Sequence, residues 1–241
     1  MNGPNRVSID VADGTQLSAY VARPRGRAPF PAILVFQEAL GVNQQIRGVA
    51  DRYAALGFIA VAPELFHRFA PGFETQTFDR DAIMPMIHKL SIEGMIADVV
   101  ATYRWAAAQP DIRRDKIASV GYCMGGRATY LANSEVPLAA AISYYGGGIA
   151  PDLLDRAPRL HGPQLFFWGG LDQGIPPEKR RAVADAVRDA GKRFVDVEFS
   201  DAQHGFFNVE LDRGNPRAAD ESWALGCAFL ENALGLELGH G

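Results

Sequence analysis

A single cysteine lies between two glycines in the stretch Gly121-Tyr122-Cys123-Met124-Gly125, directly after a short apolar run. If this stretch is a tight turn from a strand into a helix, side chains two residues before and after the cysteine would collide with the crowded backbone, which accounts for both glycines. A helix that begins at the cysteine offers free backbone N–H groups and the positive end of its dipole, and both favour a thiolate. The pattern predicts a nucleophilic cysteine at a strand-to-helix turn.

Other reactive groups follow other apolar runs. Glu38 comes shortly after AILVF, Asp172 after LFFWGG, and His204 after VDVEFS. In an open, mostly parallel sheet, the loops at the carboxyl ends of the strands converge. A thiol can attack an ester carbonyl while a histidine moves the proton and a carboxylate orients the imidazole. The chain order of nucleophile, acid and histidine is that of the α/β-hydrolases, so we predict that Cys123, Asp172 and His204 are catalytic.

Two alternatives compete with this assignment. Glycine and cysteine can meet by chance in any strand-to-helix turn, so the pentapeptide alone also fits a structural cysteine. Asp201 competes with Asp172 as the acid because it lies close to His204 in the sequence. Asp172 is favoured because it follows Gly169-Gly170 on a sharp loop, where a short side chain can point inward.

The sequence around Glu38 predicts a group that controls the thiol and part of an oxyanion hole. An ionised carboxylate beside a cysteine disfavours the thiolate, so Glu38 would keep the resting thiol less reactive. The competing interpretation is a solvated loop carboxylate. In this fold the oxyanion hole uses the backbone N–H of the residue after the nucleophile and one from the loop after an early strand. These are Met124 and Ala39, with Leu40 as the next candidate.

The apolar pattern predicts the elements that position these residues. Six nearly continuous apolar runs are typical of strands covered on both faces: PAILVFQ, GFIAVAP, KIASVGY, LAAAISYY, PQLFFWGG and RFVDVEFS. Asp13-Gly14 predicts an initial antiparallel hairpin. Helical patterns cover about 44–56, 95–108, 125–134, 177–190 and 216–233. We therefore expect an α/β protein with the α/β-hydrolase fold, a mostly parallel central sheet with helices on both faces. It should form one domain over residues 1–241, with an insertion at about 66–92 that covers the site.

Composition excludes several classes of protein. A formal net charge of −4 argues against nucleic acid as a partner, and no apolar stretch approaches the roughly 18 residues of a membrane span. The first residues lack the apolar run of a secretion signal. The sequence has two cysteines, Cys123 and Cys227, which are far apart and fit a reducing compartment. We therefore expect a cytoplasmic protein. Cys227 fits the apolar face of a helix. Phosphate-loop, dinucleotide and metal-ligand motifs are absent from the sequence, so we expect no cofactor and no metal.

The sequence also resembles a known family. The blocks that carry the resemblance are FQEALGVN, APELFHR, GYCMGG, SYYGGG, FFWGGLDQGIP and DAQHGFFN, and they are similar to those of the dienelactone hydrolase family. The resemblance implies a thiol hydrolase of small-molecule esters or lactones, with Cys123, Asp172 and His204 as its triad. It further implies that substrate binding displaces Glu38, which takes the thiol proton and leaves a thiolate paired with His204.

The resemblance weakens at the substrate-binding residues. Enzymes that cleave dienelactone bind its carboxylate through arginines, one of them four residues after the catalytic histidine, where this chain has Asn208. An anionic substrate is therefore in doubt, although Arg80 could match the other arginine. Arg127 and Asn208 itself are further candidates for substrate contact. Four aromatic residues could line the pocket and favour a neutral, apolar ester: Tyr145, Trp168, Phe206 and Phe207.

Two function classes remain open from the sequence. One is a cysteine hydrolase acting as a monomer or small homo-oligomer; the other is a non-catalytic or redox-sensing protein that keeps a reactive thiol. Asp172 and His204 favour the hydrolase, because a sensor needs no group that activates water. The other histidines should have surface or capping roles, with His67 the strongest candidate for a place near the site: His67, His88, His161 and His240.

Overall fold

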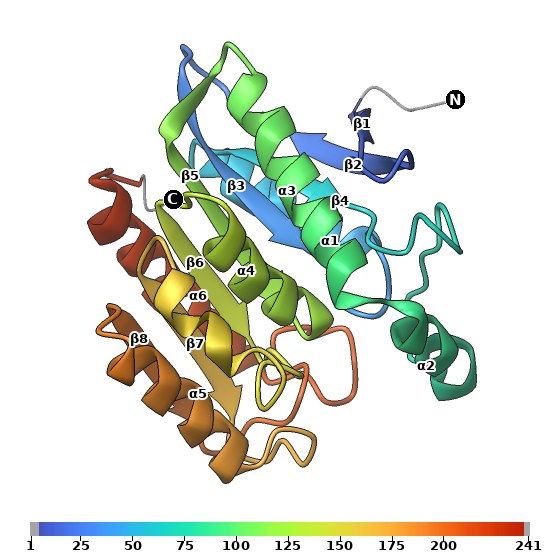
Figure 1. Ribbon diagram of the computed structural model, residues 1–241, viewed down its shortest axis with the longest axis vertical. Coiled ribbons are helices and arrows are strands. Elements are labelled where there is room, and N and C mark those ends of the chain that lie inside the picture. The colour runs from blue at the N-terminus through green and yellow to red at the C-terminus, as the bar shows by residue number, and fades with distance from the viewer. Residues whose placement is uncertain (1–4, 239–241) are drawn as a thin grey trace.

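The computed structural model describes residues 5–238, and its strands form one eight-stranded sheet (Figure 1). The strands are β1 (Arg6–Asp10), β2 (Gln16–Ala22), β3 (Phe30–Phe36), β4 (Ile59–Pro63), β5 (Ile112–Tyr122), β6 (Ala140–Tyr144), β7 (Gln164–Gly169) and β8 (Phe194–Phe199). Their spatial order is β1-β2-β4-β3-β5-β6-β7-β8. The β1–β2 and β2–β4 pairs are antiparallel and the remaining pairs are parallel. The prediction of a mostly parallel sheet that begins with a hairpin is confirmed.

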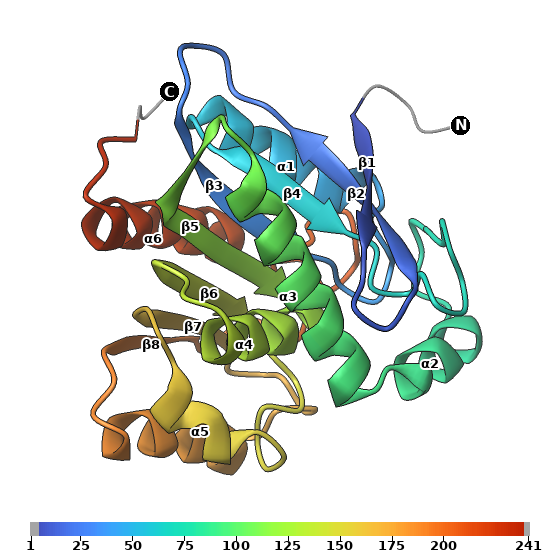
Figure 2. The same ribbon diagram turned by 45° about the horizontal axis from the view of Figure 1, so that its top comes forward.

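Helices cover both faces of this sheet. They are α1 (Gln44–Ala55), α2 (Arg80–Lys89), α3 (Ile92–Ala108), α4 (Met124–Glu135), α5 (Pro177–Asp189) and α6 (Pro216–Leu234), with a short 3₁₀ helix η1 (Leu154–Arg159). Helices α3, α4 and α5 lie on one face and α1 and α6 on the other (Figure 2). Across the second face the rings of Tyr53 and Trp223 lie 4.7 Å apart. Within residues 5–238, no helix is both long enough and apolar enough to cross a bilayer.

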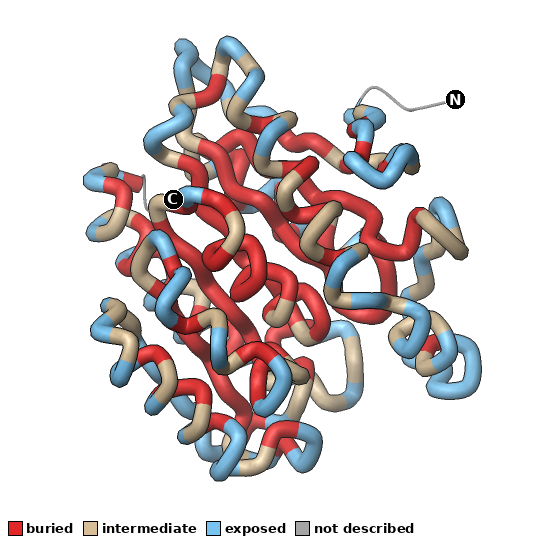
Figure 3. Tube along the Cα trace, viewed as in Figure 1, coloured by how far each residue is buried: buried red, intermediate tan, exposed pale blue. Residues whose placement is uncertain are grey.

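The core is formed by the central strands. One predicted strand, β8, is less buried than these strands. Strands β3 to β7 are largely buried between the helical layers (Figure 3). We expected Arg193–Ser200 to be covered on both faces, but β8 is the edge strand and Val195 is 42% exposed. Val195 and Val197 alternate with Asp196 and Glu198 along this strand. Such alternation is typical of a strand with one polar face, so β8 is not covered on both faces.

The segment 66–92 joins β4 to α3 and contains α2. Ile83 is fully buried in a small cluster with Ala39 and Leu40, separate from the main core. The backbone N–H of Thr75 donates to the carbonyl oxygen of Leu40 at 3.0 Å. The covering helix therefore packs directly on the loop that follows β3, one of the loops at the carboxyl edge of the sheet.

Candidate active site

Cys123 lies between the end of β5 and the start of α4, in a backbone conformation that side chains seldom adopt. Its φ and ψ angles are 55° and −118°. A Cβ atom at Gly121 would overlap the carbonyl oxygen of Gly125, and one at Gly125 would overlap that of Phe36. The two glycines are thus required by close backbone approach, as the spacing predicted. The turn leaves the half-buried Cys123 side chain at the edge of the sheet and at the N-terminus of α4.

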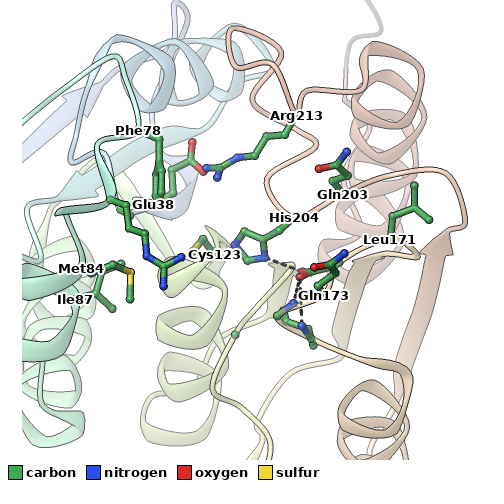
Figure 4. A pocket seen from close by; sticks show the side chains of 16 residues that line it. Glu38, Phe78, Met84, Ile87, Cys123, Leu171, Gln173, Gln203, His204 and Arg213 are labelled. Atoms are coloured by element: carbon green, nitrogen blue, oxygen red, sulfur yellow. Dashed lines mark hydrogen bonds and ion pairs between the residues drawn. The ribbon is translucent and has the colours of Figure 1, made fainter. Parts of the chain in front are cut away.

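Asp172 and His204 form a hydrogen-bonded pair on the loops after β7 and β8. Asp172 Oδ2 lies 2.7 Å from His204 Nδ1. The backbone N–H groups of Gly174 and Ile175 donate to Asp172 Oδ1 at 2.8 and 3.2 Å (Figure 4). Burial opposes the charged carboxyl, but His204 and these backbone donors outweigh it and lower the pKa of Asp172. Asp172 is therefore an ionised carboxylate with a fixed orientation toward the imidazole.

The charge of His204 depends on the nucleophile beside it. Burial alone would lower the pKa of His204, but the Cys123 sulfur and the Asp172 carboxylate together raise it to about 10. With Nδ1 held by Asp172, the opposite ring nitrogen, Nε2, is the one free to exchange a proton with the Cys123 sulfur. The arrangement therefore favours a protonated imidazole beside the Cys123 sulfur.

Removing the sulfur should shift this titration. In Cys123→Ala, burial still opposes the imidazolium, while one of the two groups that raise the pKa of His204 is gone, so this pKa should fall clearly below about 10. The measurement is an NMR titration of the imidazole signals, with His204→Gln used to assign the resonance. An unchanged titration midpoint would show that Cys123 is not the charge partner of His204.

Glu38 is buried at the same edge of the sheet. Its side chain is 1% exposed, and Oε1 accepts a hydrogen bond from Asn208 Nδ2 at 2.7 Å. Burial raises the pKa of Glu38, opposed by Asn208, Arg213 and His204. A solvated loop carboxylate is thus the wrong interpretation of this residue. Asn208, predicted as a substrate contact, instead holds Glu38.

The loop that carries Glu38 is fixed by its neighbours. Gln37 is buried, and its Oε1 accepts from the backbone N–H of Leu65 at 3.0 Å. Ala39 lines the cavity, whereas Leu40 is turned into the cluster with Ile83. Met124 is the first residue of α4, so its backbone N–H has no partner within the helix. Ala39 thus lies in the cavity with Cys123, and Met124 follows Cys123 directly at the start of α4.

A cavity of about 1040 Å³ brings these residues together. Six residues singled out from the sequence line it: Glu38, Ala39, Arg80, Cys123, Asp172 and His204. The sequence did not point to ten others: Phe78, Met84, Ile87, Gly147, Leu171, Gln173, Gly174, Ile175, Gln203 and Arg213. The cavity therefore combines a thiol, an imidazole and carboxylates with two arginines and an apolar wall.

The predicted aromatic substrate contacts are not on this lining. Trp168 is buried and donates through Nε1 to Asp196 Oδ1 at 2.5 Å, because alternate side chains of β7 face opposite sides of the sheet. Phe206 and Phe207 point into the core, where both pack on Tyr144. These three predictions are wrong.

Tyr145 and Arg127 lie next to the site without lining the cavity. The buried Tyr145 ring is 5.1 Å from the His204 ring, centroid to centroid, and the backbone φ of Tyr145 is 38°. Tyr145 thus packs on the imidazole and does not line the cavity. Arg127 lies one helical turn after Cys123, against Gly148, so its guanidinium faces the glycine loop and not the cavity.

The competing residues have partners elsewhere. Asp201 is exposed and forms an ion pair with Arg217 at 2.7 Å, so it is not positioned as the acid. His67 is buried with Nε2 3.0 Å from Asp98 Oδ1, away from the cavity. His88 and His161 are exposed, and His240 lies outside the described residues. Cys227 is buried in α6, and burial raises its pKa to about 11, which is typical of an unreactive core thiol.

Arg213 is the residue that sequence reasoning missed most clearly. Its guanidinium carbon lies 4.9 Å from the centroid of the Phe78 ring. A Cβ atom at Gly205, the residue after His204, would come within 2.5 Å of Arg213 Nε. The glycine following the histidine thus makes room for an arginine from the loop before α6. The only signal in the sequence was Gly205 beside His204. A glycine shows that some group packs closely there, but it does not show which residue that group belongs to.

Comparison with known proteins decides the family. Residues 17–234 match the model of the dienelactone hydrolase family. The chain belongs to this family. The resemblance and the α/β-hydrolase fold predicted from the sequence blocks are confirmed, and a dienelactone hydrolase family member is an enzyme that acts on ester or lactone bonds.

Individual relatives agree with this membership. The chain is 33% identical over 225 residues to a putative carboxymethylenebutenolidase of Methylorubrum extorquens, covering 90% of this chain and 77% of that protein. It is 32% identical over 182 residues to a carboxymethylenebutenolidase of Pseudomonas putida, with 74% and 76% covered. A putative dienelactone hydrolase from Klebsiella pneumoniae superposes with a TM-score of 0.83 at 27% identity, over 95% of this chain and 99% of that one.

Among residues 5–238 of this family member, no group of three or more His, Cys, Asp or Glu side chains is arranged to hold a metal ion.

Proposed function

We propose that this member of the dienelactone hydrolase family hydrolyses carboxylic esters or lactones through a Cys123-His204-Asp172 triad. The observation that carries the proposal is the 2.7 Å contact between Asp172 Oδ2 and His204 Nδ1, in the same cavity as a cysteine held at positive φ on a helix N-terminus. A nucleophile, a base and a group that orients the base are the parts that acyl transfer requires.

The acylation step forms one bond and breaks another. The Cys123 thiolate attacks the carbonyl carbon, and the developing oxyanion accepts hydrogen bonds from the backbone N–H groups of Met124 and Ala39. As the C–O bond breaks, the His204 imidazolium gives its Nε2 proton to the leaving oxygen. The products are an alcohol, or the opened ring of a lactone, and a thioester on Cys123.

Deacylation restores the enzyme. Neutral His204 takes a proton from a water molecule, and the resulting hydroxide oxygen attacks the thioester carbonyl. The C–S bond breaks, which releases the carboxylic acid and returns the thiolate beside the imidazolium. Asp172 stabilises the imidazolium in both half-reactions.

Glu38 controls when the thiolate forms. Its burial raises its pKa and makes it a stronger proton acceptor than a solvated carboxylate. In the resting enzyme, the carboxylate disfavours a negative sulfur in the same cavity. When substrate enters, Glu38 takes the thiol proton, holds it during turnover and returns it when the thiolate is released from the thioester.

Two arginines favour a substrate that carries a carboxylate. Arg80 and Arg213 both line the cavity, and among the described residues neither forms an ion pair with a carboxylate. Asn208 does not supply this charge, but Arg213 does so from five residues further along the chain. An anionic ester or lactone therefore fits the site better than the neutral substrate that Asn208 suggested.

A redox-sensing role needs the thiol alone. It gives no reason for the Asp172–His204 pair, nor for two arginines in the same cavity. A panel of p-nitrophenyl esters and small lactones, assayed with the wild type and Cys123→Ala, separates the two functions. Turnover that depends on Cys123 supports the hydrolase, whereas a panel without turnover, or turnover that survives in the variant, contradicts it.

Glu38→Gln should move two measurements in opposite directions. Loss of the negative charge favours the thiolate at rest, so Cys123 should react faster with iodoacetamide at a given pH. Loss of the proton acceptor should lower ester turnover by on the order of 10²-fold, the usual size of a general acid–base contribution.

Both measurements belong in a Cys227→Ser background, so that a single thiol is followed. The matched control is Glu210→Gln, a change of the same type at an exposed residue that does not line the cavity. If labelling and turnover both stay at the wild-type level in Glu38→Gln, Glu38 does not control the nucleophile.

A further inference from the structure

The loop that follows β3 is supported by contacts from outside itself. Residues 38–41, the oxyanion loop, carry the Glu38 carboxylate and the Ala39 backbone N–H that the proposed mechanism uses. Within the loop, the N–H of Gly41 donates to the carbonyl oxygen of Glu38 at 3.2 Å, and none of the four residues lies in a helix or a named strand. A catalytic donor must stay within about 0.5 Å of its productive position. Asn208 anchors the Glu38 side chain, whereas the Ala39 peptide depends on other contacts.

One end of the oxyanion loop pairs with the stretch of chain before α2. Gly41 and Glu74 form an isolated antiparallel bridge, and the N–H of Thr75 donates to the carbonyl oxygen of Leu40 at 3.0 Å. A Cβ atom at Gly41 would come within 2.1 Å of the carbonyl oxygen of Phe73. The two stretches of backbone are therefore in direct contact, at a position where a side chain does not fit.

Asn43 ties this bridge to α1. Asn43 is buried, and its Nδ2 donates to the carbonyl oxygen of Thr75 at 2.9 Å. Its Oδ1 accepts from the N–H of Ile46 at 3.2 Å, and this bond caps the N-terminus of α1. Arg47, also in α1, forms an ion pair with Glu74. The bridge is thus fixed by two side chains to the start of a helix that packs on the sheet.

Ile83 supports the other end of the oxyanion loop. This α2 residue is fully buried in the small cluster with Ala39 and Leu40, which is separate from the main core. Met84 and Ile87 of the same helix line the cavity (Figure 4). Helix α2 therefore touches the oxyanion loop with one side chain and the substrate space with two others.

We infer that Ile83 and Asn43 are positioning residues of the oxyanion hole. Ile83 packs on Ala39 directly, and Asn43 acts through the bridge to Thr75; together they hold the Ala39 N–H where the oxyanion forms. The segment that covers the cavity is then also the support of a catalytic donor. The inference rests on the proposed hydrolase function and assigns the side chains that make its oxyanion hole rigid.

Ile83→Ala should lower kcat for 4-nitrophenyl butyrate by about tenfold and change KM by less than about twofold. Complete loss of one oxyanion donor costs about 10²–10³-fold in kcat, and a displaced donor keeps part of this effect. Bound substrate carries no oxyanion yet, so KM should not follow kcat. Ile83→Val keeps most of the contact with Ala39 and should retain kcat within about twofold.

Ile96→Ala is the matched control. Ile96 lies in α3 and packs against the main core, so the same truncation is made outside the cluster of Ile83, Ala39 and Leu40. Its kcat should equal that of the wild type, even if its thermal midpoint falls. A loss of kcat as large as that of Ile83→Ala would contradict a specific role of Ile83.

Asn43→Ser tests the support at the other end of the loop. Serine still caps α1, but it is too short to reach the carbonyl oxygen of Thr75. The kcat should fall by about threefold to tenfold with KM retained. This variant leaves the sequence of α2 unchanged, so it remains informative if Ile83→Ala rearranges that helix.

Two reagents separate the oxyanion hole from the thiol. Iodoacetamide alkylates Cys123 by displacement of iodide at a saturated carbon, so no oxyanion forms. 1,1,1-Trifluoropentan-2-one accepts the thiolate at its carbonyl carbon, and its oxygen becomes an oxyanion that needs the same donors as the butyrate ester. In a Cys227→Ser background, Ile83→Ala should be labelled by iodoacetamide at the wild-type rate. The Ki of the ketone should rise about tenfold, in step with the loss of kcat.

The outcomes distinguish this inference from the hydrolase function. An enzyme with Cys123-dependent turnover, in which Ile83→Ala and Asn43→Ser both keep the wild-type kcat and ketone Ki, contradicts the inference alone. Labelling that slows in step with kcat also contradicts it, because the two residues would then act on the thiol. Absence of Cys123-dependent turnover in the wild type overturns the hydrolase function and the inference with it.

Discussion

Cys123→Ala and His204→Ala are each expected to lower ester turnover by at least about 10⁴-fold, because nucleophile and base act as one unit in acyl transfer. Without the sulfur no thioester forms. Without the imidazole neither the leaving oxygen nor the attacking water exchanges its proton. The double variant should be scarcely slower than either single variant, since the second change removes a group that can no longer act. The measurement is kcat for a p-nitrophenyl ester in all three variants.

The fold should survive these changes. Cys123 is half-buried and His204 lies on a loop at the cavity, so neither truncation opens a hole in the main core. Circular dichroism and the thermal midpoint are the controls for folding. A folded Cys123→Ala enzyme with near-wild-type kcat would refute the assigned nucleophile, and a strictly multiplicative loss in the double variant would refute the coupling of the two residues.

Asp172→Asn should lower kcat by about 10³–10⁴-fold, as loss of the orienting carboxylate does in serine triads. The asparagine oxygen can keep the hydrogen bonds from Gly174 and Ile175, which leaves its NH₂ group facing His204 Nδ1. An NH₂ group donates, so the histidine must accept at Nδ1 and carry its proton on Nε2. That tautomer cannot take a proton from water during deacylation.

Asp201→Asn is the matched control for this change. Asp201 is exposed, and its carboxylate pairs with Arg217 on the surface, so the loss of charge should change kcat by less than about twofold. A larger loss in Asp201→Asn than in Asp172→Asn would reverse the assignment of the acid. The kcat values of both variants against wild type, with the NMR tautomer state of His204 in Asp172→Asn, give the answer.

The sequence determined those features that short stretches of chain enforce. Gly121 follows from backbone overlap within one turn, and the apolar runs followed by reactive residues place Glu38, Cys123, Asp172 and His204 at the same edge of a parallel sheet. Family membership could also be read from these blocks, since they contain the residues that the turn and the strand ends require.

The tertiary structure alone decided which side chains share the cavity with these residues. Whether an aromatic residue near a strand end faces the core or the site depends on the packing of other elements, which is why Trp168, Phe206 and Phe207 were assigned to the wrong surroundings. Arg213 reaches the site from the loop before α6, and α2 rests on the oxyanion loop through Ile83, contacts between segments far apart in the chain. Local sterics act within a few residues, so the sequence determines the turn that presents the thiol; burial and charge pairing act across the folded chain, so only the fold determines what meets the thiol there.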